Sequence, residues 1–178
     1  MLIGPKNWHI AVSTLDDILF DLKESRHLVV CGGTALLILD IIQRETRDID
    51  IIVPEVDPIL RNVANAVAKK LSLPQDWIND GPKTLADELT TGWRERVQRL
   101  YQGKALTIDA LGRIDLLATK MYAFCDREDD FQDVINLRPT QSELKQIYPW
   151  VMDRDASDLW PNRVASCFKR VEKVLYEK

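Results

Sequence analysis

Two aspartates within a short apolar run, Asp48 and Asp50, are the residues whose types and spacing most clearly suggest chemistry. The run DIDIIV alternates and ends at Pro54, which predicts a β-strand. Residues two apart on a strand share a face, so both carboxylates would point the same way while Ile49, Ile51 and Val53 face the core. Adjacent carboxylates repel each other unless a cation lies between them, and hard oxygen ligands favour Mg²⁺ or Mn²⁺. The alternative, which Asp-x-Asp alone favours, is a solvent-facing strand with alternating acids.

A glycine pair before the preceding apolar run strengthens the first interpretation. Gly32, Gly33 and Thr34 follow an apolar run and precede a second one, so they predict a strand-to-helix turn. Glycines at such a turn let the backbone approach a ligand closely, and the N–H groups at a helix start bind anions. Gly-Gly by itself is more often only a tight turn. Together with the aspartates, it predicts a phosphate-binding turn, one helix, and a carboxylate pair for the metal that bridges those phosphates.

Apolar spacing and turn signals predict the elements that position these residues. Residues 27–31 form a β-branched and apolar run that predicts a buried strand. Residues 34 to about 43 are apolar on nearly every side, which predicts a mostly buried helix. Ser13 is expected to cap a helix over residues 14–25, and residues 57–71 predict an amphipathic helix with an acidic N-cap.

The remaining elements complete a strand and helix alternation. Residues 73–89 are rich in Pro, Gly, Asp and Asn and predict a loop with a short helix, whereas residues 105–111 predict a third strand. From residue 113 onward the chain is expected to be mostly helical, with breaks near Pro139, Pro149 and Pro161. This order predicts an α/β or α+β fold in which helices flank a small mixed sheet.

Length, charge and cysteine usage limit the possible classes of protein. The 178 residues predict one domain, with an α/β core over about residues 13–112 and a helical part over about residues 113–178. The net charge of −4 argues against a protein that coats nucleic acid, although a basic patch could still dock an RNA end. Three cysteines without a CxxC pair fit a reducing cytoplasm. No stretch approaches the roughly 20 apolar residues of a membrane span, so we expect neither secretion nor a membrane.

The segment GGTALLILDIIQRETRDIDIIV resembles the signature of the DNA polymerase β-like nucleotidyltransferases. Within that superfamily it is similar to minimal bacterial enzymes related to toxins of the AbiEii type, including an uncharacterised nucleotidyltransferase family. Their Arg-x-Thr-x-Asp-h-Asp form, where h is apolar, matches Arg44, Thr46, Asp48 and Asp50. The resemblance implies a polymerase β-like fold, metal binding by both aspartates, and nucleotide binding by Gly32, Gly33, Thr34 and Thr46.

A second segment, DLLATKMYAFCDREDDFQDVINL, is similar to another signature of these enzymes. It implies that Lys120 and Arg127 contact the triphosphate and that Asp130 acts as a base or orients a reacting group. From residue types and helical spacing alone, the alternatives are that Lys120 is solvated and that Asp130 and Asp133 form salt bridges or cap a helix. The resemblance to the superfamily also implies a third metal carboxylate, for which Asp109 is the candidate and Asp130 and Asp133 are the alternatives.

The basic and aromatic segment at residues 92–104 has two interpretations. Its arginines, Trp93 and Tyr101 could stack on bases or bind phosphates of RNA, but an amphipathic helix with an ordinary charged face is the more common structure for such a sequence.

The motifs together lead to a functional hypothesis. We expect a Mg²⁺- or Mn²⁺-dependent nucleotidyltransferase that moves NMP from an NTP to an acceptor hydroxyl and releases pyrophosphate. The resemblance implies an RNA acceptor such as a tRNA 3′ end, and a toxin neutralised by an antitoxin protein. The alternatives are a protein acceptor and a nucleotide-binding or interaction module of the same fold without turnover.

Overall fold

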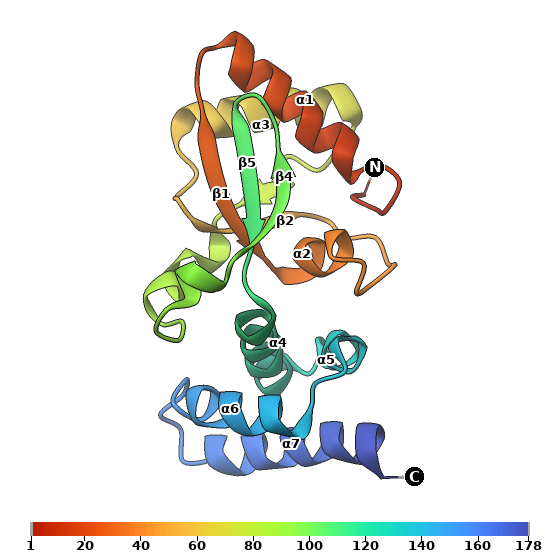
Figure 1. Cartoon of the computed structure of the whole chain (residues 1–178), viewed down its shortest axis with the longest axis vertical. Coiled ribbons are helices and arrows are strands. Elements are labelled where there is room, and N and C mark those ends of the chain that lie inside the picture. The colour runs from red at the N-terminus through yellow and green to blue at the C-terminus, as the bar shows by residue number, and fades with distance from the viewer. Residues whose placement is uncertain (1, 178) are drawn as a thin grey trace. The chain divides into compact units, whose positions relative to one another are not determined.

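The computed structural model describes residues 2–177, and the chain divides into two compact units, Met1–Gly112 and Arg113–Lys178. Figure 1 shows the elements along the chain. That the two units form a single nucleotidyltransferase domain stays a prediction. The first unit contains α1 (Trp8–Asp21), β1 (Arg26–Cys31), α2 (Gly32–Ile38), β2 (Ile49–Val53), α3 (Pro58–Leu71), β3 (Ile78–Asn79), the 3₁₀ helices η1 (Gly81–Asp87) and η2 (Trp93–Arg96), β4 (Gln98–Gln102) and β5 (Leu106–Ala110).

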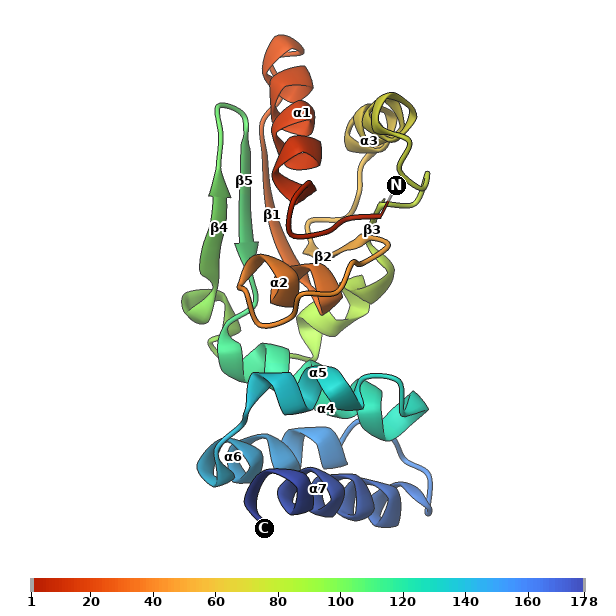
Figure 2. The same ribbon diagram turned by 90° about the vertical axis from the view of Figure 1, so that its right-hand side faces the viewer.

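A five-stranded mixed sheet in the order β3-β2-β1-β5-β4 is the centre of the first unit. β1 is antiparallel to β2 and parallel to β5, and β4 forms an antiparallel hairpin with β5. The pairing aligns Val30 with Ile51 and with Ala110, and all three side chains are fully buried. Helices α1 and α3 contact each other, and Figure 2 shows α1 in front of the sheet. The predicted fold class, a small mixed sheet flanked by helices, is therefore confirmed.

The opposite face of the sheet carries the three aspartates of the first unit that the sequence singled out. Cys31 of β1 is aligned with Asp50 of β2, and Val29 of β1 is aligned with Asp109 of β5. Because aligned residues of neighbouring strands point to the same face, Asp50 and Asp109 lie on one face. Asp48 precedes Asp50 by two residues and belongs to this face as well.

Most of the expected strands and helices of the first unit are confirmed within a few residues, and two helix boundaries are wrong. α1 begins at Trp8, five residues before Ser13, so the residue expected to cap the helix lies inside it. The Ser13 hydroxyl donates to the carbonyl oxygen of Ile10 at 3.2 Å, so the helix accommodates it without ending there. α2 ends at Ile38, because Asp40 adopts a left-handed conformation with φ of 60°.

The expectation of an amphipathic helix over residues 92–104 is also wrong. Only η2 is helical there, and residues 98–102 form β4 at an edge of the sheet. The strand is held by its pairing with β5 and by Tyr101, whose hydroxyl donates to Asp16 of α1 at 3.2 Å. The loop expected at residues 73–89 includes the short strand β3 besides η1.

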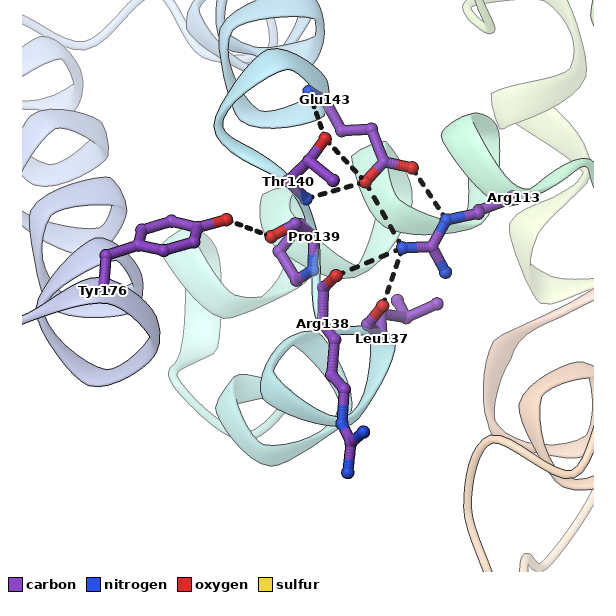
Figure 3. A network of polar contacts seen from close by, with 7 residues as sticks. All are labelled: Arg113, Leu137, Arg138, Pro139, Thr140, Glu143 and Tyr176. Carbon is purple, nitrogen blue, oxygen red and sulfur yellow. Dashed lines mark hydrogen bonds and ion pairs between the residues drawn. The ribbon is translucent and has the colours of Figure 1, made fainter.

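The second unit is helical, as expected, and contains α4 (Arg113–Arg127), α5 (Phe131–Leu137), α6 (Gln141–Met152) and α7 (Trp160–Tyr176). A polar network joins three of these helices (Figure 3): Arg113 of α4 binds Glu143 of α6 at 2.7 Å and donates to the carbonyl oxygen of Leu137. The break expected near Pro139 is confirmed, since α5 ends at Leu137. The break near Pro149 is wrong, because this proline lies in the last turn of α6, where few backbone hydrogen bonds follow it.

Candidate active site on strand β2

Asp48 and Asp50 form a half-buried carboxylate pair at the start of β2. Asp50 is the second residue of the strand, and Asp48 directly precedes it. Burial raises the pKa of the Asp48 carboxyl, and the negative charges of Asp50 and Asp76 raise it further. The surroundings therefore offset the negative charge of the ionised pair only in part, and a bound cation would reduce the remaining repulsion.

Asn79 of β3 is a polar partner of both carboxylates, and the sequence analysis did not single it out. Its Nδ2 lies 3.3 Å from Oδ2 of Asp48 and 3.2 Å from Oδ1 of Asp50. The parallel pairing of β3 with β2 aligns Asn79 with Asp50 and so places the amide on the same face. No periodic pattern could have identified a strand of only two residues, although the apolar pair before Asn79 was a weak signal.

The backbone of Gly32, the first residue of α2, packs closely against the carboxylate of Asp50. Its φ of +70° lies in the left-handed region, and a Cβ atom there would lie 2.3 Å from Oδ2 of Asp50. Glycine tolerates this conformation and leaves the required space. The role predicted for the glycine pair, a close backbone approach, is thus observed at Gly32 toward a carboxylate of the chain itself.

The hydroxyls of Thr34 and Thr46 bind each other inside the unit. Their oxygens are 2.6 Å apart, and Thr34 also donates to the carbonyl oxygen of Asp48. A hydroxyl has one hydrogen, so Thr46 must be the donor to Thr34. Both side chains are buried, and they tie the start of α2 to the backbone that carries the carboxylate pair. That either threonine contacts a nucleotide stays a prediction.

Arg44 lies beside the glycine turn. Its guanidinium nitrogens are 3.6 Å and 3.7 Å from the position that a Cβ atom on Gly33 would occupy. The sequence analysis noted Arg44 only as part of a motif. The structure places this cation at the start of α2, next to the same turn whose other glycine touches Asp50.

Asp109 is not brought together with the carboxylate pair. It lies two strands from β2, where its carboxylate accepts from Nε2 of His27 at 2.6 Å and from Nε of Arg99. Burial acts to raise the pKa of Asp109, but the hydrogen bonds from Arg99 and His27 outweigh it and lower the pKa. The nearly buried carboxylate is thus satisfied by two neighbours of its own sheet.

In the second unit, Lys120 of α4 lies in a buried ion cluster. Its Nζ is 2.5 Å from Oδ1 of Asp130 and 2.7 Å from Oδ2 of Asp133, and Arg127 reaches Asp130 at 3.0 Å. Burial acts to raise the pKa of Asp130, but the hydrogen bond and charge of Lys120 and the charge of Arg127 lower it. Lys120 is only 7% exposed, so the alternative that it is a solvated lysine is wrong. Its catalytic role stays a prediction.

The carboxylate pair fits a divalent cation that shares its ligands with a substrate. Within residues 2–177, no group of three His, Cys, Asp or Glu side chains is arranged to hold a metal ion. Mg²⁺ is commonly bound by one or two carboxylates, and water and substrate phosphates complete its shell. Two half-buried carboxylates, one with a raised pKa, suit that form of binding and do not suit an all-protein cage.

Comparison with known proteins identifies the family. A family model described as nucleotidyltransferase of unknown function (DUF6036) matches residues 10–142, which is more than half of the chain and includes both the carboxylate pair and the Lys120 cluster. Neither a curated protein nor a solved structure matches the chain. In the range 2–177, every helix is too short or too polar to cross a membrane.

Proposed function

The chain belongs to this family of nucleotidyltransferases of unknown function, and on that premise we propose that it transfers NMP from an NTP to an acceptor hydroxyl. The reaction would require Mg²⁺ or Mn²⁺ and would release pyrophosphate. The observation that carries the proposal is the pair Asp48 and Asp50, fixed on one strand face against Gly32, with burial and mutual repulsion raising the pKa of Asp48.

The two carboxylates would hold the cation, and the fold positions both of them. Asp50 is placed by β2 and fits against Gly32, and Asp48 is tied to α2 through the hydrogen bond from Thr34 to its carbonyl oxygen. When bound, Mg²⁺ would offset the negative charge of the phosphates and favour ionisation of the acceptor hydroxyl. The acceptor oxygen would then attack the α-phosphorus, the bond to the β-phosphate oxygen would break, and pyrophosphate would leave.

Arg44 and the backbone at Gly33 are the groups of the first unit that we assign to the β- and γ-phosphates. The guanidinium beside Gly33 is a planar donor with a permanent charge, which suits phosphate oxygens. Charge that develops on the leaving pyrophosphate would be stabilised by such fixed donors. Lys120, Arg127 and Asp130 keep the roles that the resemblance implies as part of the proposal.

For the acceptor, we propose RNA, such as a tRNA 3′ end, and for the cellular role a toxin that a partner protein neutralises. The support is the similarity of the motif around Asp48 and Asp50 to the AbiEii-type enzymes. A hydroxyl on a protein is the second acceptor class.

A nucleotide-binding module without turnover is a second candidate function, and two observations favour it. The hydroxyls of Thr34 and Thr46 are engaged with each other, and Asp109 is bound by His27 and Arg99. Neither feature adds a ligand or a third carboxylate to the pair.

The test is incubation of the purified protein with each of the four α-³²P-labelled NTPs, Mg²⁺, and total cellular RNA or protein. Label in one fraction that disappears in both Asp48→Ala and Asp50→Ala would support transfer and would identify the base and the acceptor class. Binding of an NTP in the presence of the metal, without any label transferred, would favour the module. Growth arrest on expression that is lost in the Asp48→Ala protein would support the toxin role.

A further inference from the structure

The amide of Asn79 lies directly beside the carboxylate pair. Its Nδ2 is within 3.3 Å of both Asp48 and Asp50. A single neutral donor therefore spans two carboxylates that would otherwise repel each other. Such an amide holds the pair together when no cation is bound.

The orientation of this amide is fixed by its other end. Oδ1 of Asn79 accepts a hydrogen bond from the backbone N–H of Gly81 at 2.9 Å. An N–H group can only donate, so the oxygen must face Gly81 and the NH₂ group must face the carboxylates. Asn79 is consequently presented to the site as a donor, and in this orientation it cannot act as an oxygen ligand to a cation.

The other acids near the pair already have partners. Asp76 is bound by Arg47 at 2.9 Å, and Asp80 accepts from the backbone N–H of Val56 at 3.1 Å. Next to the two carboxylates, β3 therefore presents the N–H donor of Asn79 and no further carboxylate.

We propose that Asn79 sets the order of binding, such that a divalent cation binds this site only weakly by itself and tightly only together with the NTP. The inference rests on the proposed function, because the phosphates of the NTP supply the ligands that Asn79 withholds. Cation affinity in carboxylate sites rises with the number of charged ligands. An aspartate at position 79 would keep the oxygen that accepts from Gly81 and would add the missing charge at nearly the same volume.

The test uses Mn²⁺ alone as the probe, followed by the electron paramagnetic resonance signal of the free ion as the full-length protein is titrated. Three proteins are compared: the wild type, Asn79→Asp, and Asn79→Ala, which removes the donor without adding charge. We expect Asn79→Asp to bind Mn²⁺ at least about tenfold more tightly than the wild type, and Asn79→Ala to stay within about threefold of it. In the wild type, binding of an α,β-methylene NTP analogue, followed by tryptophan fluorescence, should weaken at least about tenfold when EDTA replaces Mn²⁺.

Equal Mn²⁺ affinity in the wild type and Asn79→Asp would overturn the inference, and so would an equal gain in Asn79→Ala. If Asn79→Asp does not fold without metal, its unfolding midpoint is compared with and without Mn²⁺, and a shift no larger than in the wild type contradicts the inference. Label transfer by the wild type with no gain in Asn79→Asp would refute this inference alone. A gain in Asn79→Asp together with Mn²⁺-dependent binding of the NTP analogue, but no label transfer by the wild type, would refute the proposed transfer and support the inference for a nucleotide-binding module. Analogue binding in the wild type that is unchanged by EDTA would overturn the inference.

Discussion

Replacement of Gly32 by alanine should disrupt the carboxylate pair more than it disrupts the fold. The substitution forces a Cβ atom to within 2.3 Å of Oδ2 of Asp50 and places a side chain at a φ of +70°. The left-handed conformation costs a non-glycine residue about 1–2 kcal/mol. Rotation of the Asp50 side chain away from its present position adds about 0.5–1.5 kcal/mol.

Gly92 supplies a matched control in the same unit. Its φ is +76°, but an added Cβ atom would meet only the ends of the Glu95 and Arg96 side chains, at 3.1 Å and 3.3 Å. Gly92→Ala should therefore cost the same backbone term of about 1–2 kcal/mol without moving Asp50. Urea denaturation of both variants measures the difference in the free energy of unfolding, which we expect to be about 1 kcal/mol.

The functional difference should be much larger than the difference in stability. A displacement of about 1 Å of a group that positions reactants can cost about 100-fold in rate. Transfer of label from an α-³²P-labelled NTP, and binding of Mn²⁺ with the NTP analogue, should both fail in Gly32→Ala and persist in Gly92→Ala. If folded Gly32→Ala transfers label as fast as Gly92→Ala, Asp50 does not depend on Gly32 for its position and the reasoning is wrong.

Three further predictions concern charges in both units. Asp16→Asn should cost about 2 kcal/mol at pH 7, because the buried carboxylate accepts backbone hydrogen bonds from Lys104, Ala105 and Leu106. Burial acts to raise the pKa of Asp16, but these hydrogen bonds outweigh it and lower the pKa. The loss of stability in Asp16→Asn, measured by urea denaturation, should therefore shrink as pH falls below the ordinary carboxyl range through that lowered pKa. Lys120→Met should cost about 3–5 kcal/mol, because it removes the buried cation that two buried carboxylates share. Arg127→Gln, at an exposed partner, should cost less than about 1 kcal/mol, and similar unfolding midpoints for the two variants would contradict this. In metal-free buffer at pH 7, Asp48→Asn should raise the urea midpoint of unfolding, because the raised pKa of Asp48 means that its ionised form disfavours the fold. The stability of the wild type should rise as pH falls through that raised pKa, and the stability of the variant should not.

The strands and the faces of Asp50 and Ile51 could be predicted because they depend on local pattern. The face predicted for Val53 is wrong, because an irregularity in the pairing of β1 with β2 aligns Val53 with Val29. The β-branched run before Gly32 and the alternation around Asp48 and Asp50 specify buried strands wherever a sheet is available. The same patterns predicted the fold class, a small mixed sheet flanked by helices, which the structure confirms. The predicted N-cap at Asp57 is observed as well, since its side chain accepts from the backbone N–H of Leu60 at 2.9 Å.

The features that escaped prediction depend on tertiary contacts. Asn79 reaches the site through a strand of two residues, which has no period to detect. The edge strand β4 looks amphipathic and helical by composition, and only its pairing with β5 and the bond from Tyr101 to Asp16 decide otherwise. Lys120 is buried against the carboxylates of Asp130, which precedes α5, and Asp133, which lies within α5, and no local pattern specifies these contacts.

The measurement that tests the central claim most directly compares α-³²P- and γ-³²P-labelled forms of the preferred NTP in the transfer reaction. Wild-type protein with Mg²⁺ should move the α label to the acceptor and leave the γ label in pyrophosphate, and Asp50→Asn should move neither. Transfer of the γ label would contradict nucleotidyl transfer, and α-label transfer at the wild-type rate by Asp50→Asn would contradict the assignment of the carboxylate pair.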